Sequence, residues 1–398
     1  MAPFACCSSF AAVALLALGY LPRHALAEAP APAAPGRAAG SPYLVPLRRE
    51  SVPIRRRGKV VSFKTSYSGN ISVGRPAQEF RVVFDTGSGH LVLPAAECLS
   101  PSCLAHRRYN VSRSQTAVPI NGDGSIVEPG ALCDQVTIGF GTGEVTGEFV
   151  RERVCLGSEA WPDEAASING LVSAPCVDMH VVTAVEMSTQ PFRSFAFDGI
   201  LGLALSGLAL SERFSYLEVV ASQQGGPLRD PRPAQFAAFL TEGDDGEASE
   251  IAFGGHNPTR ALEPLSWAPV ALPGLGYWQV QILSVRIGGV ALDVCQDGSC
   301  RGVIDTGSSH LGVPATHEAQ VAALLTRPAG SAGEDCRFAS APEVEIEIPG
   351  RNLTLGPENY MRRMPLEENV SVGVRGVSLN GSSPRRPRGG GGGAPVVA

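Results

Sequence analysis

The sequence predicts an all-β protein built from two lobes. A chain of 398 residues is long enough for two domains or one large two-lobed unit. Its 46 glycines and 32 prolines are typical of many short strands joined by turns. One stretch also occurs twice, as "VVFDTGSGHLVLP" at 82–94 and "GVIDTGSSHLGVP" at 302–314. Two copies with matching flanks, 220 positions apart, indicate two lobes built on one plan.

Composition and charge restrict the class of protein. Hydrophobic residues make up 44% of the chain and the mean hydropathy is +0.07, values that suit a globular protein. The net charge of −6 argues against a general nucleic-acid partner.

The first residues are typical of a targeting segment. An apolar run at 10–21 is too short to span a bilayer, and the small-residue pattern Ala25-Leu26-Ala27 follows it. We therefore expect a signal peptide at 1–27, with an uncleaved anchor as the alternative. No later run of 18 apolar residues occurs, so we expect no stable membrane span in the mature chain.

Residues 28–57 have the composition of a linker or propeptide. The segment 28–41 is rich in Ala, Pro and Gly, and Arg55–Arg57 is either a processing site or a solvated basic patch. Removal of residues 1–57 would take seven arginines and two glutamates and leave a body with a net charge of −11. We expect this basic propeptide to dock on its own acidic body.

Ten cysteines fit an oxidising compartment. Cys98 and Cys103 are five residues apart, as are Cys295 and Cys300, and each pair can close a small polar loop. A metal site is the alternative, but no histidine stands at ligand spacing, so we expect no metal. No cofactor is expected either. The compartment is expected to be the secretory pathway, outside the cell or in an acidic vacuole-like organelle, and the sequons agree with this: Asn70, Asn110, Asn352, Asn369 and Asn380.

The repeated motif suggests a chemistry. Asp85 and Asp305 each end an apolar run, where a buried charge needs partners. Two carboxyl groups about 3 Å apart share one proton, so one can activate a water while the other protonates a substrate carbonyl. The sequence therefore predicts amide hydrolysis without a covalent intermediate. The structural alternative is a pair of capped turns in a duplicated β protein.

The neighbours of the two aspartates fit this chemistry. Glycines allow a sharp turn with backbone amides close to each carboxylate. Threonines can hydrogen-bond across the interface, and serines can donate to the outer carboxylate oxygens. The supporting residues expected are Thr86, Gly87, Ser88, Thr306, Gly307 and Ser308.

From Tyr67 to Met361 the sequence resembles the pepsin-like aspartic proteases. Besides the two motifs, the resemblance rests on "CLSPSC", "FDGILGL", "IAFGG", "YWQVQI" and "CQDGSC", at 98–103, 197–203, 251–255, 277–282 and 295–300. It implies a two-lobed fold of double-ψ β-barrels and a cleft that binds peptides in extended form. It further implies a monomeric aspartic endopeptidase with an acidic optimum, and disulfides in the two small cysteine loops.

The stretch 138–147, "IGFGTGEVTG", resembles the flap hairpin of that family. It supplies the expected substrate-binding residues Phe140, Gly141, Thr142 and Gly143. The family usually has tyrosine in place of Phe140 and tryptophan in place of Val92. We therefore expect a flap held by packing alone.

The C-terminal part departs from the family. Residues 344–363 still fit, but 364–398 contain no matching segment and end in a basic, Gly-rich stretch. Cys336 loses its usual partner, and Cys133, Cys155 and Cys176 have no sure pairing, although Cys155–Cys176 could close an inserted loop. The expected regions are a first lobe at 58–265, a truncated second lobe at 266–363 and a disordered tail at 364–398.

Two other functions follow from these departures. An incomplete second lobe could leave a catalytically impaired peptide-binding or decoy protein. A carbohydrate-binding, inhibitor-like relative is the third possibility, which the two intact aspartates argue against.

Overall fold

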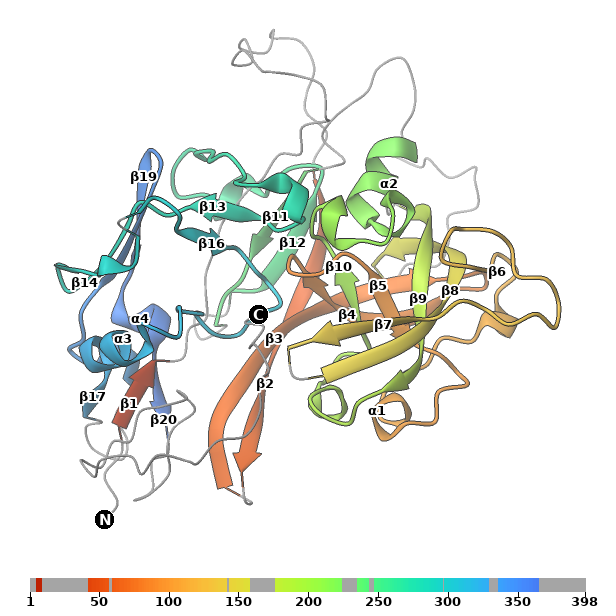
Figure 1. Ribbon diagram of the computed structural model, residues 1–398, viewed down its shortest axis with the longest axis horizontal. Helices are drawn as coiled ribbons and strands as arrows, with labels where there is room; N and C mark the ends of the chain where they lie inside the picture. The colour runs from red at the N-terminus through yellow and green to blue at the C-terminus, as the bar shows by residue number, and fades with distance from the viewer. Residues whose placement is uncertain are drawn as a thin grey trace, which may run out of the picture.

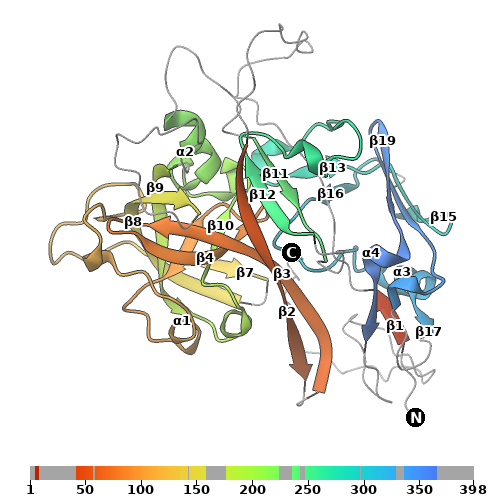
Figure 2. The same ribbon diagram turned by 180° about the vertical axis from the view of Figure 1, so that it is seen from behind.

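The computed structural model describes residues 5–8, 42–56, 59–141, 143–157, 176–223, 235–242, 247–295, 297–328 and 336–364. The protein is mostly β, as predicted, with a few short helices. Figures 1 and 2 show strands β4 to β10 on one side of the long β2–β3 hairpin and the strands of the C-terminal part on the other side.

An eleven-stranded sheet contains this hairpin. Its order is β11-β12-β2-β3-β4-β10-β5-β9-β8-β6, with β7 paired to β8. The strands are β2 Tyr43–Arg56, β3 Lys59–Val73, β4 Gln78–Asp85, β5 Leu91–Pro94, β6 Val118–Ile120, β7 Val136–Phe140, β8 Gly143–Leu156, β9 Cys176–Met187, β10 Gly199–Gly202, β11 Phe236–Phe239 and β12 Ser249–Phe253.

Three small sheets contain the other strands. β13 pairs with β16, β14 lies between β15 and β18, and β19 completes that four-stranded sheet. β1 lies between β17 and β20. The strands are β1 Ala5–Ser8, β13 Gln279–Gln281, β14 Ser284–Ile287, β15 Val290–Ala291, β16 Arg301–Val303, β17 Arg327–Pro328, β18 Val344–Ile348, β19 Arg351–Leu355 and β20 Met361–Met364.

In the described segments, four short α-helices flank the sheets: α1 Pro101–Leu104, α2 Tyr216–Gln223, α3 Glu318–Leu325 and α4 Pro357–Tyr360. Among the residues described, no helix has the length and apolar character needed to cross a membrane.

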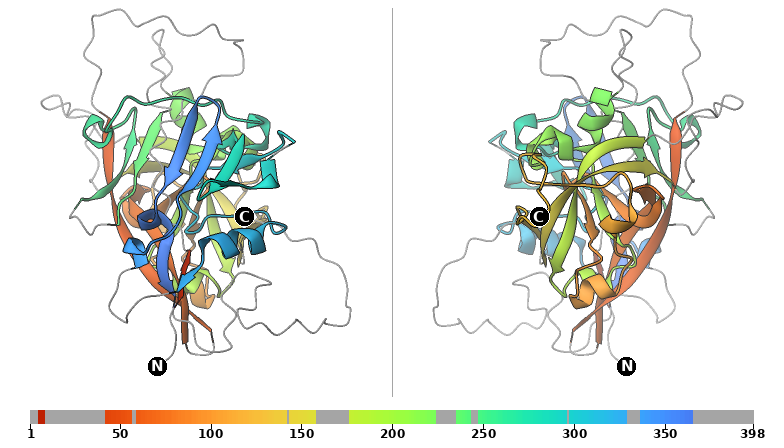
Figure 3. Two further views of the ribbon diagram at one scale, coloured as in Figure 1. Left: turned by 90° about the vertical axis from the view of Figure 1, so that its left-hand side faces the viewer. Right: turned by 90° about the vertical axis from the view of Figure 1, so that its right-hand side faces the viewer.

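β2 is an inner strand of the large sheet. Its first residues pair with β12 and the following residues with β3, while Val45 and Leu47 are buried in the main core. The part of the hairpin beyond that core runs along one side of the molecule (Figure 3). The segment expected to be a propeptide thus contributes core side chains to the larger lobe.

The two lobes have separate apolar cores. The larger core includes Trp278, which is 1% exposed and donates its indole N–H to the carbonyl of Leu203 at 2.7 Å. The smaller core gathers residues of α3, β14, β18 and α4, among them Leu325 and Tyr360. The predicted lobe boundaries stay predictions.

Most of the predicted signal peptide and all of 365–398 lie outside the described residues. Within the first segment, the structure describes the backbone of Ala5–Ser8, which pairs antiparallel with β20 as well as β17.

Candidate active site

The two copies of the repeated motif contact each other where the two lobes meet. Asp85 ends β4, whose preceding residues Val82 to Phe84 are buried between β3 and β10. Asp305 follows β16 and lies in a half-buried turn. Because the apolar residues of β4 are buried, Asp85 at the end of this strand is held at the lobe interface. The residue is only 9% exposed.

The two turns interlock around the glycines. A methyl group at Gly87 would lie 2.8 Å from a carboxylate oxygen of Asp305, and one at Gly307 would overlap Asp85. Each carboxyl group thus lies over the glycine of the opposite turn, and the two carboxyl groups are within hydrogen-bonding reach of one another. Only glycine leaves room for this approach.

Two threonines join the turns by crossed hydrogen bonds. The Thr86 N–H donates to the Thr306 hydroxyl at 3.1 Å, and the Thr306 N–H donates to the Thr86 hydroxyl at 2.9 Å. Each hydroxyl then donates to a carbonyl of the other lobe, that of Ile304 at 2.8 Å and that of Phe84 at 2.5 Å. The pair fixes the relative positions of the two aspartates.

Each carboxylate also receives two bonds from its own turn. The hydroxyl of Ser88 donates to Asp85 at 2.5 Å, and that of Ser308 to Asp305 at 2.6 Å. The glycine of each turn donates its N–H to the second oxygen of the same carboxylate, at 3.0 Å for Gly87 and 2.8 Å for Gly307. The structure thus brings together all eight residues of the two motifs.

Burial and charge act strongly on one carboxyl group. Burial, followed by the negative charge of Asp305, raises the pKa of Asp85 to about 7, against the opposing hydrogen bond from Ser88. A carboxyl group with such a pKa carries a proton in acidic solution. The pair can therefore hold one proton and one negative charge.

The two histidines that follow the motifs lie in different surroundings. His90 is buried, its pKa is lowered to about 4 by that burial, and its Nε2 accepts the N–H of Leu210 at 3.0 Å. His310 is more exposed than His90. Among the described residues, no group of three or more His, Cys, Asp or Glu side chains could hold a metal ion.

The expected flap is the β7–β8 hairpin. Its tip contains Gly141 at φ 55°, a conformation that suits glycine, while Thr142 lies outside the described residues. Phe140 packs edge-on against Phe192 at 5.8 Å between ring centroids, and a methyl group at Gly143 would collide with Phe192. A small apolar cavity of about 20 Å³ lies behind the flap, lined in part by Val92, Phe140, Phe192, Phe195 and Phe197.

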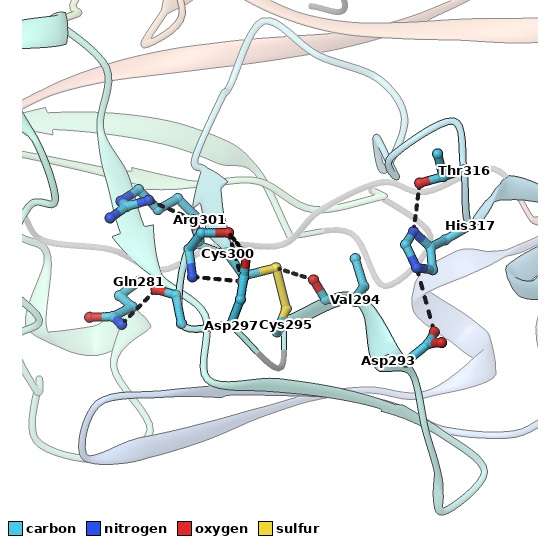
Figure 4. The surroundings of a disulfide bond; sticks show 11 residues. Gln281, Asp293, Val294, Cys295, Asp297, Cys300, Arg301, Thr316 and His317 are labelled. Carbon is cyan, nitrogen blue, oxygen red and sulfur yellow. Dashed lines mark hydrogen bonds and ion pairs between the residues drawn. A yellow bond between two sulfur atoms is a disulfide. The ribbon is translucent and has the colours of Figure 1, made fainter.

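The predicted disulfides are present. Cys98–Cys103 closes the loop at α1, and Cys295–Cys300 closes the loop before β16 (Figure 4), the strand that leads to Asp305. Cys155–Cys176 joins the ends of β8 and β9, and Cys133 is a free thiol. Cys336 is also disulfide-bonded, and because no cysteine follows it in the sequence, its partner is not the usual later one but precedes it in the chain.

One residue close to the dyad was missed by the sequence reading. Lys64 of β3 lies near enough to Asp85 and Asp305 for both carboxylates to act on its pKa. The next residue, Thr65, accepts a hydrogen bond from Ser309 at 2.5 Å. A short-range motif could not reveal this proximity, because β3 reaches the dyad only through the tertiary fold.

Comparisons with known proteins agree with this geometry. The protein-family model for eukaryotic aspartyl proteases matches residues 66–384. The chain is 31% identical to pepsin A of Canis lupus familiaris over 79% of its length and 72% of the relative's. It is 30% identical to cathepsin E of Aquarana catesbeiana (79% and 71%) and 28% identical to gastricsin of Mus musculus (80% and 73%). The chain therefore belongs to the eukaryotic aspartyl protease family.

Proposed function

We propose that the protein is an aspartic endopeptidase that hydrolyses peptide bonds through a water activated by Asp85 and Asp305 in acidic solution. The observation that carries this proposal is the interlocked pair of carboxyl groups, each over the glycine of the opposite turn. Family membership supports the reaction class.

The raised pKa of Asp85 suggests which aspartate is the general acid and which is the general base. Asp85 holds the proton and donates it to the carbonyl oxygen of the scissile bond. Asp305 is the base that takes a proton from the water as it attacks the carbonyl carbon. Because the groups are coupled, the pair titrates as a unit. The hydroxyls of Ser88 and Ser308 each hold one oxygen of their aspartate, and the two glycine amides hold the other oxygen, while the proton moves between the two carboxyl groups.

The substrate is a peptide in extended conformation, held between the dyad and the β7–β8 flap. Phe140 and the aromatic residues behind it offer an apolar surface to a substrate side chain. Thr142 and the flap glycines supply backbone groups for the peptide.

The remaining expectations belong to the same proposal. The enzyme acts as a monomer in the secretory pathway, either secreted or in an acidic compartment, after loss of a signal peptide at 1–27. Residues 28–57 act as its propeptide, and the lobes divide near residue 266.

A decoy is the second candidate, because the two turns are supported unequally. β10 lies beside β4, and Leu203, the residue after β10, donates its N–H to the carbonyl of Asp85 at 2.7 Å. Within the described part of the chain, β16 has three residues and pairs only with β13, and Val303 is 46% exposed. A loosely held Asp305 would favour peptide binding without turnover.

The experiment that tests the proposal is cleavage of denatured globin between pH 3 and 7, with and without pepstatin. We expect cleavage that pepstatin blocks and that Asp85→Asn and Asp305→Asn each abolish. Pepstatin binding with no cleavage would instead support the decoy. Cleavage that persists in both variants would refute the proposed chemistry.

A further inference from the structure

Lys64 is one of few lysines in the chain and lies beside the active-site turn that carries Asp305. Only two of the 32 basic residues are lysines, Lys59 and Lys64. Lys64 lies on β3 opposite Val52 of β2, one residue before the carbonyl that Ser309 contacts. Its backbone is therefore fixed at the junction of the large sheet and the Asp305 turn.

The side chain of Lys64 reaches the aromatic surface behind the flap, which is formed by Phe192, Phe195 and Phe197. Its Nζ lies 4.6 Å from the ring centroid of Phe195, which stacks on Phe197 at 4.6 Å and packs edge-on against Phe192. The same three phenylalanines line the apolar cavity next to Phe140. The ammonium group thus borders the surface that would accept an apolar substrate side chain.

The ammonium group has incomplete compensation for its burial. Burial lowers the pKa of Lys64, and the attraction of Asp85 and Asp305, which raises it, does not offset this effect. In the part of the chain described here, no carboxylate lies within 4.0 Å of its Nζ. A peptide in the cleft would displace more water and increase the cost of an unpaired cation.

We propose that Lys64 selects peptide substrates with an acidic side chain close to the apolar residue that occupies the aromatic surface behind the flap. This inference rests on the proposed endopeptidase function. A glutamate or aspartate of the substrate would supply the anion that Lys64 lacks, as a charge-assisted hydrogen bond in a partly desolvated site. A neutral side chain at that position would leave the ammonium group unpaired.

The pairing of a substrate glutamate with Lys64 limits the pH range in which glutamate peptides are preferred. A substrate glutamate is ionised above its ordinary pKa of about 4.3, while Asp85 keeps its proton below about 7. The titratable groups that act on Lys64 are Asp85, Asp305 and His310. The pKa of His310 is lowered by partial burial and then by the charge of Lys64, which favours its neutral form. Preference for glutamate over glutamine should therefore increase from pH 3.5 to pH 5.5.

The test uses matched fluorogenic peptides with one fixed phenylalanine and either glutamate or glutamine at each neighbouring position. For the wild-type protein we expect a ratio of kcat/KM of about tenfold in favour of glutamate at one position at pH 5.5. Lys64→Gln should reduce this ratio to about one, and Lys64→Arg should keep part of it. Lys64→Glu should favour a lysine peptide instead.

Lys59→Gln is the matched control, because it removes the only other lysine in the sequence. Lys59 lies opposite Arg56 in the backbone pairing of β2 and β3, at the far end of the hairpin. This variant should keep the wild-type ratio. A ratio that is unchanged in Lys64→Gln, or no glutamate preference at any position, would overturn the inference.

Failure of the proposed function gives a different result. If the wild-type protein cleaves none of the peptides, the dissociation constants of reduced-amide glutamate and glutamine peptides decide the inference. Tighter binding of the glutamate peptide that Lys64→Gln abolishes would support it, and equal binding by both proteins would refute it.

Discussion

Thr86 and Thr306 donate their backbone N–H groups to each other's hydroxyls, so that the two halves of the active site hold one another in position. Each hydroxyl also donates to a carbonyl of the opposite lobe. The positions of the catalytic candidates therefore depend on bonds between lobes as well as on each lobe's own strands.

Thr306→Ala should weaken this junction. The change removes a hydroxyl that accepts from Thr86 and donates to Phe84, and it leaves those backbone groups unpaired. We expect a loss of about 1–3 kcal/mol in the free energy of unfolding and a lower kcat. Urea unfolding and peptide cleavage measure both effects. Thr306→Ser keeps the hydroxyl and is the control; an equal loss in that variant would contradict the role given to the hydroxyl.

Gly307→Ala should disrupt the dyad. The new methyl group would overlap the carboxylate of Asp85, so the aspartates would have to separate. Because small displacements of reacting groups are costly, we expect activity to fall about 100-fold or more. Gly312→Ala lies in the same segment with no atom within 4 Å of the new methyl, and should be close to wild type. Similar activity in the two variants would refute the interlocked geometry.

The pKa of Asp85 makes stability depend on pH. Its pKa is raised in the folded protein from an ordinary value of 3.8 to about 7, so the folded state favours the protonated form. The resulting stabilisation is fully present below the unfolded pKa and is lost as the pH rises through about 7. Asp85→Asn cannot ionise and should lose this dependence.

The free energy of unfolding at pH 4 and pH 7.5, by urea titration, tests this prediction. The wild-type protein should lose more stability between the two pH values than Asp85→Asn, by a difference of the order of a few kcal/mol. The same pH dependence in both proteins would contradict the assignment of the raised pKa to Asp85.

A protease that cuts at Arg55–Arg57 should nick the protein without releasing β2. β2 pairs with both β3 and β12, and Val45, at 1% exposure, packs in the main core. Since β3 begins at Lys59, almost no residues lie between the cut and β3 that could form a replacement for β2. Limited trypsin digestion followed by native mass spectrometry should find the fragment bound to the body until denaturant is added. A body that elutes alone and remains folded would refute this retention.

Some of the site could be predicted because the chemistry is local in sequence. Each Asp-Thr-Gly-Ser motif contains its carboxylate, its turn glycine and its donors, and the duplication indicated that the copies would meet. The loops closed by Cys98–Cys103 and Cys295–Cys300 were accessible for the same reason, since each pair spans five positions.

Long-range pairing explains what could not be predicted. The arginines of the segment 43–56 suggested a detachable leader, whereas burial of Val45 depends on β12, about 200 residues later. The position of Lys64 over Phe195 likewise arises from a contact between distant segments. No short pattern in the chain encodes them.

The pH dependence of kcat/KM for one fluorogenic peptide, in the wild-type protein, Asp85→Asn and Asp305→Asn, tests the shared-proton dyad most directly. We expect a bell-shaped profile whose upper limb falls near pH 7, and a loss of about 100-fold to 10,000-fold in each variant. A wild-type rate that keeps rising above pH 8, or either variant within tenfold of the wild-type rate, would contradict the account.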